Sequence, residues 1–280
     1  GDADLARWIA GETAFPDSMV DSITPATDEP LRAEAAERLG VADAWPVQRE
    51  RFVQWVVGEG LGELCAPFAE AGVTLTGDVA AFEAAKLRLL NGAHSTLAYV
   101  GLAMGLETVA EAMAQPRLAG FVEALMRRDI APSLRPAAGL DLDSYIAAIL
   151  TRFRNPAMVH RLGQIAWDGS QKLPIRLLAT IAEALAAGRP ADRLCLGVAA
   201  WMRFVREQAR AGRDLTDPLA ARLLELGRAC TGDPADDVAR FLDLAAVFPE
   251  GLARDPRFRT ALEQAYAGLD MKPLRLPSLD

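Results

Sequence analysis

A short segment in the first third of the chain carries the richest combination of reactive side chains. Between Glu83 and His94 lie a carboxylate, Lys86, Asn91 and one of only two histidines in the chain. On a regular α-helix, with about 100° per residue, Asn91 lies about 140° round from Lys86, and His94 lies about 80° round on the same side. Glu83 lies one turn before Lys86. A lysine, an amide and an imidazole that face one pocket are the groups needed to reduce a carbonyl.

Gly92 interrupts this segment with a residue that weakens helices. A glycine inside a helix costs about 1 kcal/mol relative to alanine. We therefore expect a ligand or another stretch of backbone to approach closely at Gly92.

The elements that position these residues are predicted to be helical from Asp78 onward, with breaks at prolines. The stretch from Ser95 to Met113 is apolar on most sides, which predicts a central buried helix whose Gly101 and Gly105 allow close crossing. Amphipathic helices are expected around it at 141–152, 173–187, 192–211, 217–230, 235–247 and 257–269.

The first 75 residues have a different character. Two β-like runs, Ser18 to Thr24 and Arg51 to Val57, flank a short helix from Leu31 to Leu39. Two isolated strands with exposed edges do not form a stable sheet in water. We infer that they complete a sheet of a nucleotide-binding domain that is absent from the chain.

Nothing in the chain is expected to provide that domain itself. The segment Gly58-Glu-Gly60-Leu-Gly62 comes nearest to a phosphate-binding turn, but its spacing differs from G-x-G-x-x-G and no βαβ unit is expected around it. The predicted organisation is a connecting segment with short strands at 1–75, which packs on the missing domain, and a helical substrate-binding and catalytic domain at 76–280.

Composition limits the classes of partner and site. A net charge of −8 argues against nucleic acid, whose binding depends on basic residues. No apolar run approaches the roughly 18 residues needed to span a bilayer, and no signal peptide begins the chain, so a cytoplasmic protein without membrane contact is expected. Cys65, Cys195 and Cys230 are odd in number and widely spaced, which favours reduced thiols. With two histidines, no histidine metal cluster is expected.

Three segments, in this order, resemble the signatures of the mannitol dehydrogenase family, the polyol-specific long-chain dehydrogenases and reductases. Phe15 to Pro25 resembles "F-x-x-S/T-M-V-D-R-I-x-P", and Lys86 to His94 resembles "Lys-x4-Asn-x2-His". The third segment resembles "R-F-x-N-P" at 152–156 and "D-G-S-x-K-x-P" at 168–174. The resemblance extends over nearly the whole chain, but it covers only the C-terminal part of these enzymes, which begin with a Rossmann-type nucleotide-binding domain.

The fold that this resemblance implies is mainly α. It is a multi-helical C-terminal dehydrogenase domain, similar to that of 6-phosphogluconate dehydrogenase, with a few N-terminal strands that would complete the sheet of an absent Rossmann domain.

The resemblance also assigns roles to residues. Lys86, Asn91 and His94 match the catalytic trio, and Glu83 matches the gate of a proton channel. Substrate contacts are implied for the remaining matches, which are Val20, Asp21 and Lys172. The chain departs from the family pattern at Ser22, where many members have arginine, and at Gln164, where mannitol-specific members carry arginine; the second departure weakens the case for mannitol.

The chemistry of ketone reduction explains this combination of side chains. Hydride addition leaves an alkoxide that must be protonated, and a buried lysine with a lowered pKa can supply that proton. Lys86 is the candidate acid and base, Asn91 and His94 are candidate donors to the oxyanion, and Glu83 is a candidate proton carrier to solvent. No metal is required for this route.

The function implied by the resemblance is an NAD-dependent oxidoreductase, with NADP possible, that interconverts a 2-keto sugar or keto-uronate and its polyol or aldonate. D-fructuronate/D-mannonate is slightly favoured over fructose/mannitol. The partners are a sugar or sugar-acid substrate and the N-terminal Rossmann domain of the same protein. The alternative is a non-enzymatic helical module that binds or assembles without a nucleotide domain. In that reading Lys86 is a solvated surface cation, His94 a core histidine and Asn91 a helix cap. His160 has no motif behind it and is expected to be structural.

Overall fold

A computed structural model describes residues 2–271, 274 and 276–277. The chain divides into two compact units. We call residues 1–84 and 135–140 the sheet unit, and residues 85–134 and 141–280 the helical unit. Most of the described residues are helical, which confirms the predicted fold class at this level.

The sheet unit is built on three short strands in the order β1 (Ser18–Asp21), β2 (Gln54–Gly58) and β3 (Thr74–Thr76). β1 pairs antiparallel with β2, and β2 pairs parallel with β3. Parallel neighbours need a crossover, which here runs through η1 (Gly62–Leu64) and α3 (Cys65–Glu70). The expectation that no βαβ unit surrounds the Gly58 turn is therefore wrong.

The two predicted strands are present but shorter than expected, and β3 was not expected. The predicted helix in this region is also present, as α2 (Glu29–Leu39), which Asp28 caps through its side chain. The other helices of this part are α1 (Ala3–Glu12), which the sequence reasoning missed, and α4 (Val79–Ala85). A small core joins the sheet to α4 through Met19, Val56, Val79 and Phe82.

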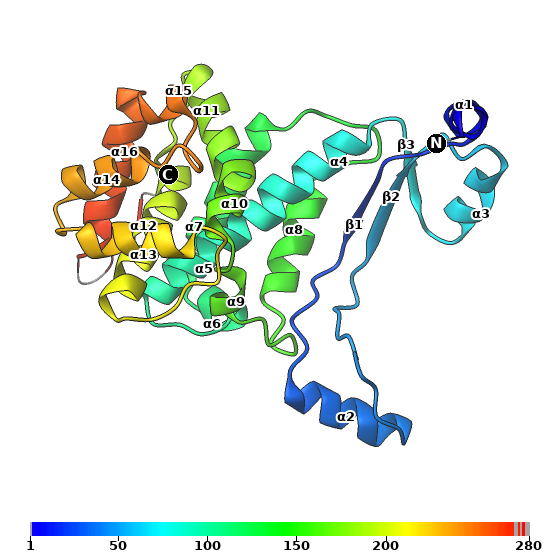
Figure 1. The fold of residues 1–280 in the computed structure, drawn as a ribbon, viewed down its shortest axis with the longest axis horizontal. Helices are drawn as coiled ribbons and strands as arrows, with labels where there is room; N and C mark the ends of the chain where they lie inside the picture. The colour runs from blue at the N-terminus through cyan, green and yellow to red at the C-terminus, as the bar shows by residue number, and fades with distance from the viewer. Residues whose placement is uncertain (1, 272–273, 275, 278–280) are drawn as a thin grey trace. The chain divides into compact units, whose positions relative to one another are not determined.

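The helical unit is organised round α12 (Asp192–Arg210), which packs against α5 (Ala93–Ala103), α13 (Ala220–Ala229) and α16 (Pro256–Leu269) (Figure 1). α12 and α5 cross closely because Gly197 lies against the Thr96 side chain, where a Cβ would overlap with Oγ1. The remaining helices of this unit are α6 (Val109–Met113), α7 (Pro116–Ala124), α8 (Leu142–Phe153), α9 (Leu162–Ile165), α10 (Gly169–Leu173), α11 (Ala179–Ala186), α14 (Pro234–Leu242) and α15 (Glu250–Ala253), with a 3₁₀ turn η4 (Ala131–Ser133).

Three stretches of this unit are π-helical among the described residues: η2 (Lys86–Gly92), η3 (Leu125–Ile130) and η5 (Pro174–Leu178). η2 packs against both η3 and η5. A π-helix carries its backbone hydrogen bonds between residues five apart, and such turns are rare and frequent at functional sites. α-helical periodicity does not predict them.

Two predicted helices are divided in the structure. The central helix expected from Ser95 to Met113 ends at Ala103, where Gly105 takes a positive φ of 78° and stops it. Thr108 then caps α6 in a capping box with Glu111. Gly101 does allow a close crossing, against Leu162, whereas Gly105 has no such neighbour. The helix expected at 173–187 is η5 followed by α11.

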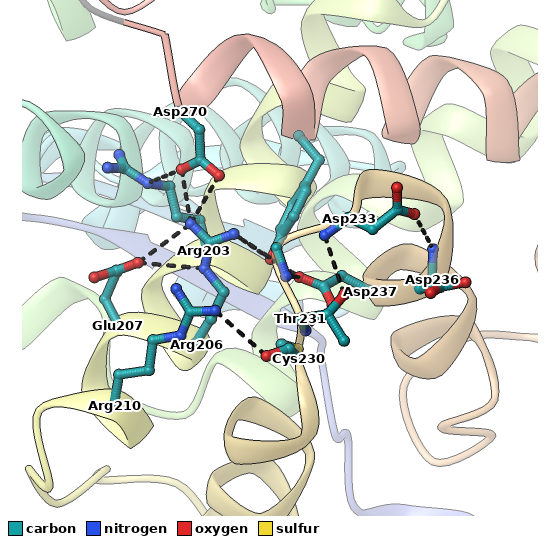
Figure 2. A network of polar contacts seen from close by, with 12 residues as sticks. Arg203, Arg206, Glu207, Arg210, Cys230, Thr231, Asp233, Asp236, Asp237 and Asp270 are labelled. Atoms are coloured by element: carbon teal, nitrogen blue, oxygen red, sulfur yellow. Dashed lines mark hydrogen bonds and ion pairs between the residues drawn. The ribbon is translucent and has the colours of Figure 1, made fainter.

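A buried network of charges fastens the last helix to α12 (Figure 2). Arg206 donates to Asp270 over 2.7 Å and to the Tyr266 hydroxyl over 3.0 Å, and that hydroxyl donates to Asp237 over 2.9 Å. Asp237 is fully buried, and it also accepts from the backbone N–H groups of Thr231 and Gly232. Every buried charge in the group is therefore paired or hydrogen-bonded, as buried charges require.

Candidate functional site

Lys86 and Asn91 share one face of a helix because that helix is of the π type between them. α4, η2 and α5 follow one another without a break in helical backbone. In a π turn the residues five apart are linked by the backbone hydrogen bond, so Lys86 and Asn91 lie on the same side of the helix. The expected separation of about 140° assumed a regular α-helix, and it is corrected here. Both side chains are half-buried.

Gly92 allows another backbone to approach this segment, as its position in the sequence predicted. A Cβ at residue 92 would lie 2.8 Å from the carbonyl oxygen of Arg176, in η5. Any other residue would push η2 and η5 apart. The neighbouring backbone that was expected is therefore Arg176, and the contact fixes η2 against the element that follows Lys172.

His94 lies at the start of α5, where it is buried between two rings. Its imidazole stacks on Phe153 with centroids 4.8 Å apart and meets His160 edge-on at 4.7 Å. Nε2 of His94 and Nδ1 of His160 are buried and have no hydrogen-bond partner among the described residues. The two histidines of the chain thus form one pair.

Both imidazoles are held neutral near pH 7. Burial lowers the pKa of His94 well below its usual value, and His160, Arg176, Arg152 and Lys172 lower it further. Burial also lowers the pKa of His160, to about 4. A neutral imidazole donates from one nitrogen and accepts at the other. His94 can therefore act as a neutral hydrogen-bond donor.

Lys172 is carried by α10, whose first turn is fixed by Asp168 and Ser170. Asp168 takes a left-handed backbone conformation, φ 55°, and donates its N–H to the carbonyl of Thr216 over 2.8 Å. Ser170 donates both its N–H and its hydroxyl to Asp217, over 2.9 and 2.6 Å. Lys172 is half-buried, and its ammonium lies 3.9 Å from the Asp168 carboxylate.

The pKa of Lys172 is lowered, first by burial and then by the nearby Arg176. Arg176 lies four residues further on, in η5, and donates to the hydroxyl of Ser95 over 2.9 Å. Ser95 follows His94 directly. The structure thus brings Lys172 into the same electrostatic environment as His94, with Arg176 between their helices.

The other predicted residues lie in the sheet unit. Val20 and Asp21 are the last two residues of β1; Val20 is half exposed and Asp21 is buried. Glu83 lies in α4 with its side chain exposed.

Gln164 lies in α9 and lines a cleft of about 560 Å³ with Arg161, Trp167 and Phe204. Lys172 is not among the described residues that line this cleft.

Cys65, Cys195 and Cys230 are free thiols. In the part of the chain that the structure describes, no group of three metal-binding side chains gathers. Within the same residues, no helix combines the length and apolar character needed to cross a membrane.

Sequence reasoning missed two residues of this environment. His160 was expected to be structural, yet it contacts His94 edge-on; its signal was that the chain has only one other histidine. Arg176 was not singled out, although it follows Lys172 at helical spacing. Neither lies in a motif, and only the packing of η5 and of the loop between α8 and α9 against the helix of His94 reveals them.

The fold thus consists of a small mixed sheet and a mainly helical domain. One helix of the helical domain carries the lysine, the amide and the imidazole of the candidate site. Residues 78–270 match the model of the mannitol dehydrogenase C-terminal domain, and residues 1–63 match that of the mannitol dehydrogenase Rossmann domain. The chain belongs to the mannitol dehydrogenase family. The second match revises the expectation that nothing in the chain provides part of that Rossmann domain.

Curated relatives include enzymes with two different names. The chain is 38% identical over 260 residues to mannitol 2-dehydrogenase of Aspergillus fumigatus, covering 91% of the chain and 51% of that protein. It is 38% identical over 270 residues to D-mannonate oxidoreductase of Escherichia coli, covering 96% of the chain and 55% of that protein. The chain thus spans about half the length of the curated relatives it matches.

A solved structure also has this fold. Mannitol 2-dehydrogenase of Pseudomonas fluorescens, in a ternary complex with NAD and D-mannitol, superposes with a TM-score of 0.83 at 34% identity. The superposition covers 98% of this chain and 55% of that one.

Proposed function

We propose that the chain is the substrate-binding and catalytic part of an NAD-dependent oxidoreductase, which interconverts a 2-keto sugar or keto-uronate with its polyol or aldonate. NADP is a possible substitute for NAD. The observation that carries the proposal is the π turn of η2, which aligns Lys86 with Asn91 directly before the buried, neutral His94. Relatives named as dehydrogenases and oxidoreductases support an enzyme over a non-enzymatic module.

Each residue of the trio has a separate task in this reaction. Lys86 gives a proton to the alkoxide during reduction and takes it back during oxidation. The amide of Asn91 and the ring of His94 donate hydrogen bonds to the developing oxyanion, and donors fixed in advance are the main source of such stabilisation. Because His94 is neutral, it does not compete with Lys86 as a proton donor. Glu83, which is exposed, carries the proton between Lys86 and solvent.

The substrate is held by Val20, Asp21 and Lys172, with a sugar acid preferred to a neutral sugar. Lys172 can pair with a carboxylate of the substrate, and hydrogen bonds between ionised groups are the stronger ones. Gln164, where mannitol-specific members of the family carry arginine, also favours D-fructuronate/D-mannonate. A relative named D-mannonate oxidoreductase matches the chain as well as those named for mannitol do.

The described residues do not fit a complete dinucleotide site. The crossover after β2 has glycines at 58, 60 and 62, which is not the G-x-G-x-x-G spacing, and α3 is six residues long without a side-chain cap. Glu59 and Glu63 flank the turn and would repel a pyrophosphate. We therefore propose that a Rossmann domain of the same protein holds most of the cofactor and that the strands of residues 1–75 complete its sheet. Residues 76–280 form the helical catalytic domain, similar to the C-terminal domain of 6-phosphogluconate dehydrogenase.

Replacing the proposed acid tests this function. In the full-length protein, Lys86→Ala should lower turnover of fructuronate with NADH by about 10²-fold or more, the usual contribution of a general acid. Added primary amines should restore part of the loss, because they can supply the proton. Arg254→Ala, at an exposed position on α15, should leave turnover unchanged. Near-normal turnover of Lys86→Ala from pH 6 to 10 would show that Lys86 is not the acid.

A further inference from the structure

Arg176 is a half-buried cation, and in the part of the chain that the structure describes no acidic side chain pairs with it. Among the described residues, its only hydrogen bond is the one that Nη1 donates to the Ser95 hydroxyl. No carboxylate acts on its pKa, which burial lowers. A guanidinium has five N–H donors in a planar fork. The other donors of Arg176 are not among the buried atoms that lack a partner, so they face accessible space.

The position of this guanidinium is fixed from two sides. Its backbone carbonyl lies against Gly92, next to Asn91, where no room remains for a Cβ. Its side chain is held by Ser95, next to His94, and Ser95 is almost fully buried. Arg176 is thus tied to both the amide and the imidazole of the candidate site through their direct neighbours in sequence.

The acids nearest to this region are already occupied. Asp217 accepts from the N–H and the hydroxyl of Ser170 and from the N–H of Leu219. Asp168 lies 3.9 Å from the ammonium of Lys172. Asp168 and Asp217 both act on the charge of Lys172, whereas among the described residues no carboxylate is paired with Arg176. Two neighbouring cations whose donors are open to accessible space attract an anion, and a guanidinium can hold a carboxylate there by charge-assisted hydrogen bonds.

We infer that Arg176 is a second binding residue for an anionic group of the substrate, acting beside Lys172 and choosing sugar acids over neutral sugars. A planar fork matches a carboxylate with two parallel hydrogen bonds, which an ammonium cannot do. Lys172 attracts the carboxylate of the substrate as a point charge, and Arg176 fixes the orientation of that carboxylate. This inference rests on the proposed function, because it concerns the substrate of the same site.

Kinetics with paired substrates test the inference. In the full-length protein, Arg176→Met should lower kcat/KM for fructuronate by about 10- to 100-fold, the range for a hydrogen bond to a charged group. Most of the loss should be in KM. For fructose, kcat/KM should change by less than about 3-fold. Lys172→Met should also lower kcat/KM more for fructuronate than for fructose. Arg254→Met, which removes an exposed arginine of α15, is the control. Equal loss for both substrates would overturn the assignment.

Binding separates this inference from the proposed reaction. Calorimetry with D-mannonate and with D-mannitol should show binding of the acid weakened by Arg176→Met and binding of mannitol unchanged. If neither the wild type nor any variant turns over either sugar, but binding of D-mannonate still depends on Arg176, the anion site is supported and the proposed reaction is refuted. If Arg176→Met keeps the melting temperature of the wild type and binds D-mannonate as tightly, the anion site is refuted whatever the turnover.

Discussion

The histidine pair should make the unfolding free energy of the helical unit depend on pH between about 7.5 and 5.0. His160 has a pKa of about 4 in the folded state, against about 6.5 for an unperturbed histidine. At pH 5.0 it is therefore neutral when folded and mostly protonated when unfolded. The unfolded state binds more protons, so stability falls as the pH falls below about 6.5 and continues to fall until about pH 4.

The expected magnitude follows from these two values. Between pH 7.5 and 5.0 the protonation of unfolded His160 favours unfolding by about 30-fold, or about 2 kcal/mol of unfolding free energy. His94, whose pKa is also lowered, acts in the same direction. Asp129 acts in the opposite direction, because burial raises the pKa of its carboxyl and the folded state then takes up its proton more readily.

Urea unfolding of the 280-residue chain at the two pH values provides the measurement. Wild type should lose at least about 2 kcal/mol between pH 7.5 and 5.0, and His160→Gln should lose about 2 kcal/mol less. Because the chain has only two histidines, their imidazole proton signals can be followed separately by NMR. An identical pH dependence in wild type and His160→Gln, or a folded His160 that titrates near pH 6.5, would refute the reasoning.

Two further predictions concern the glycine contact and the division of labour. Gly92→Ala should destabilise the helical unit by about 1 to 3 kcal/mol in urea unfolding, because its Cβ would meet the Arg176 carbonyl at 2.8 Å. The control variant Gly163→Ala, which has open space around the added Cβ, should not be destabilised in this way. Similar stabilities for the two variants would contradict the close contact. The 280-residue chain alone should show no NADH-dependent reduction of fructuronate or fructose, whereas the full-length protein should; turnover by the chain at micromolar concentration would count against a separate nucleotide-binding domain.

Helices with strong apolar periodicity were predictable from the sequence. α8, α12 and α16 begin and end within one residue of expectation, because each has an apolar stripe and signals at its ends such as Asp141 before α8. α14 begins as expected after Asp233 but ends at Leu242, five residues earlier than predicted. α1 was missed although Leu5, Trp8 and Ile9 are spaced as on one face of a helix, and these side chains are exposed in the described structure.

The candidate site was predictable only where chemistry and spacing mark it together. Lys86, Asn91 and His94 lie on one helix, as expected, but their mutual orientation depends on a π turn that has no periodic signature. His160 reaches the neighbourhood of His94 from the loop between α8 and α9, and Arg176 reaches it from η5, both through tertiary packing. Such contacts join residues far apart in the chain, and no local pattern encodes them.

The π turn of η2 also determines what is needed to place this site on another protein scaffold. Five residues of a π turn span the same rotation as about four residues of an α-helix, so the Lys-x4-Asn spacing and the helix type belong together. Placed unchanged on an ordinary α-helical scaffold, the motif would point its amide away from its lysine. A designer who works with regular helices should shorten the gap to three residues. Likewise, a search for similar sites in unrelated helical proteins should look for lysine and asparagine four apart as well as five apart.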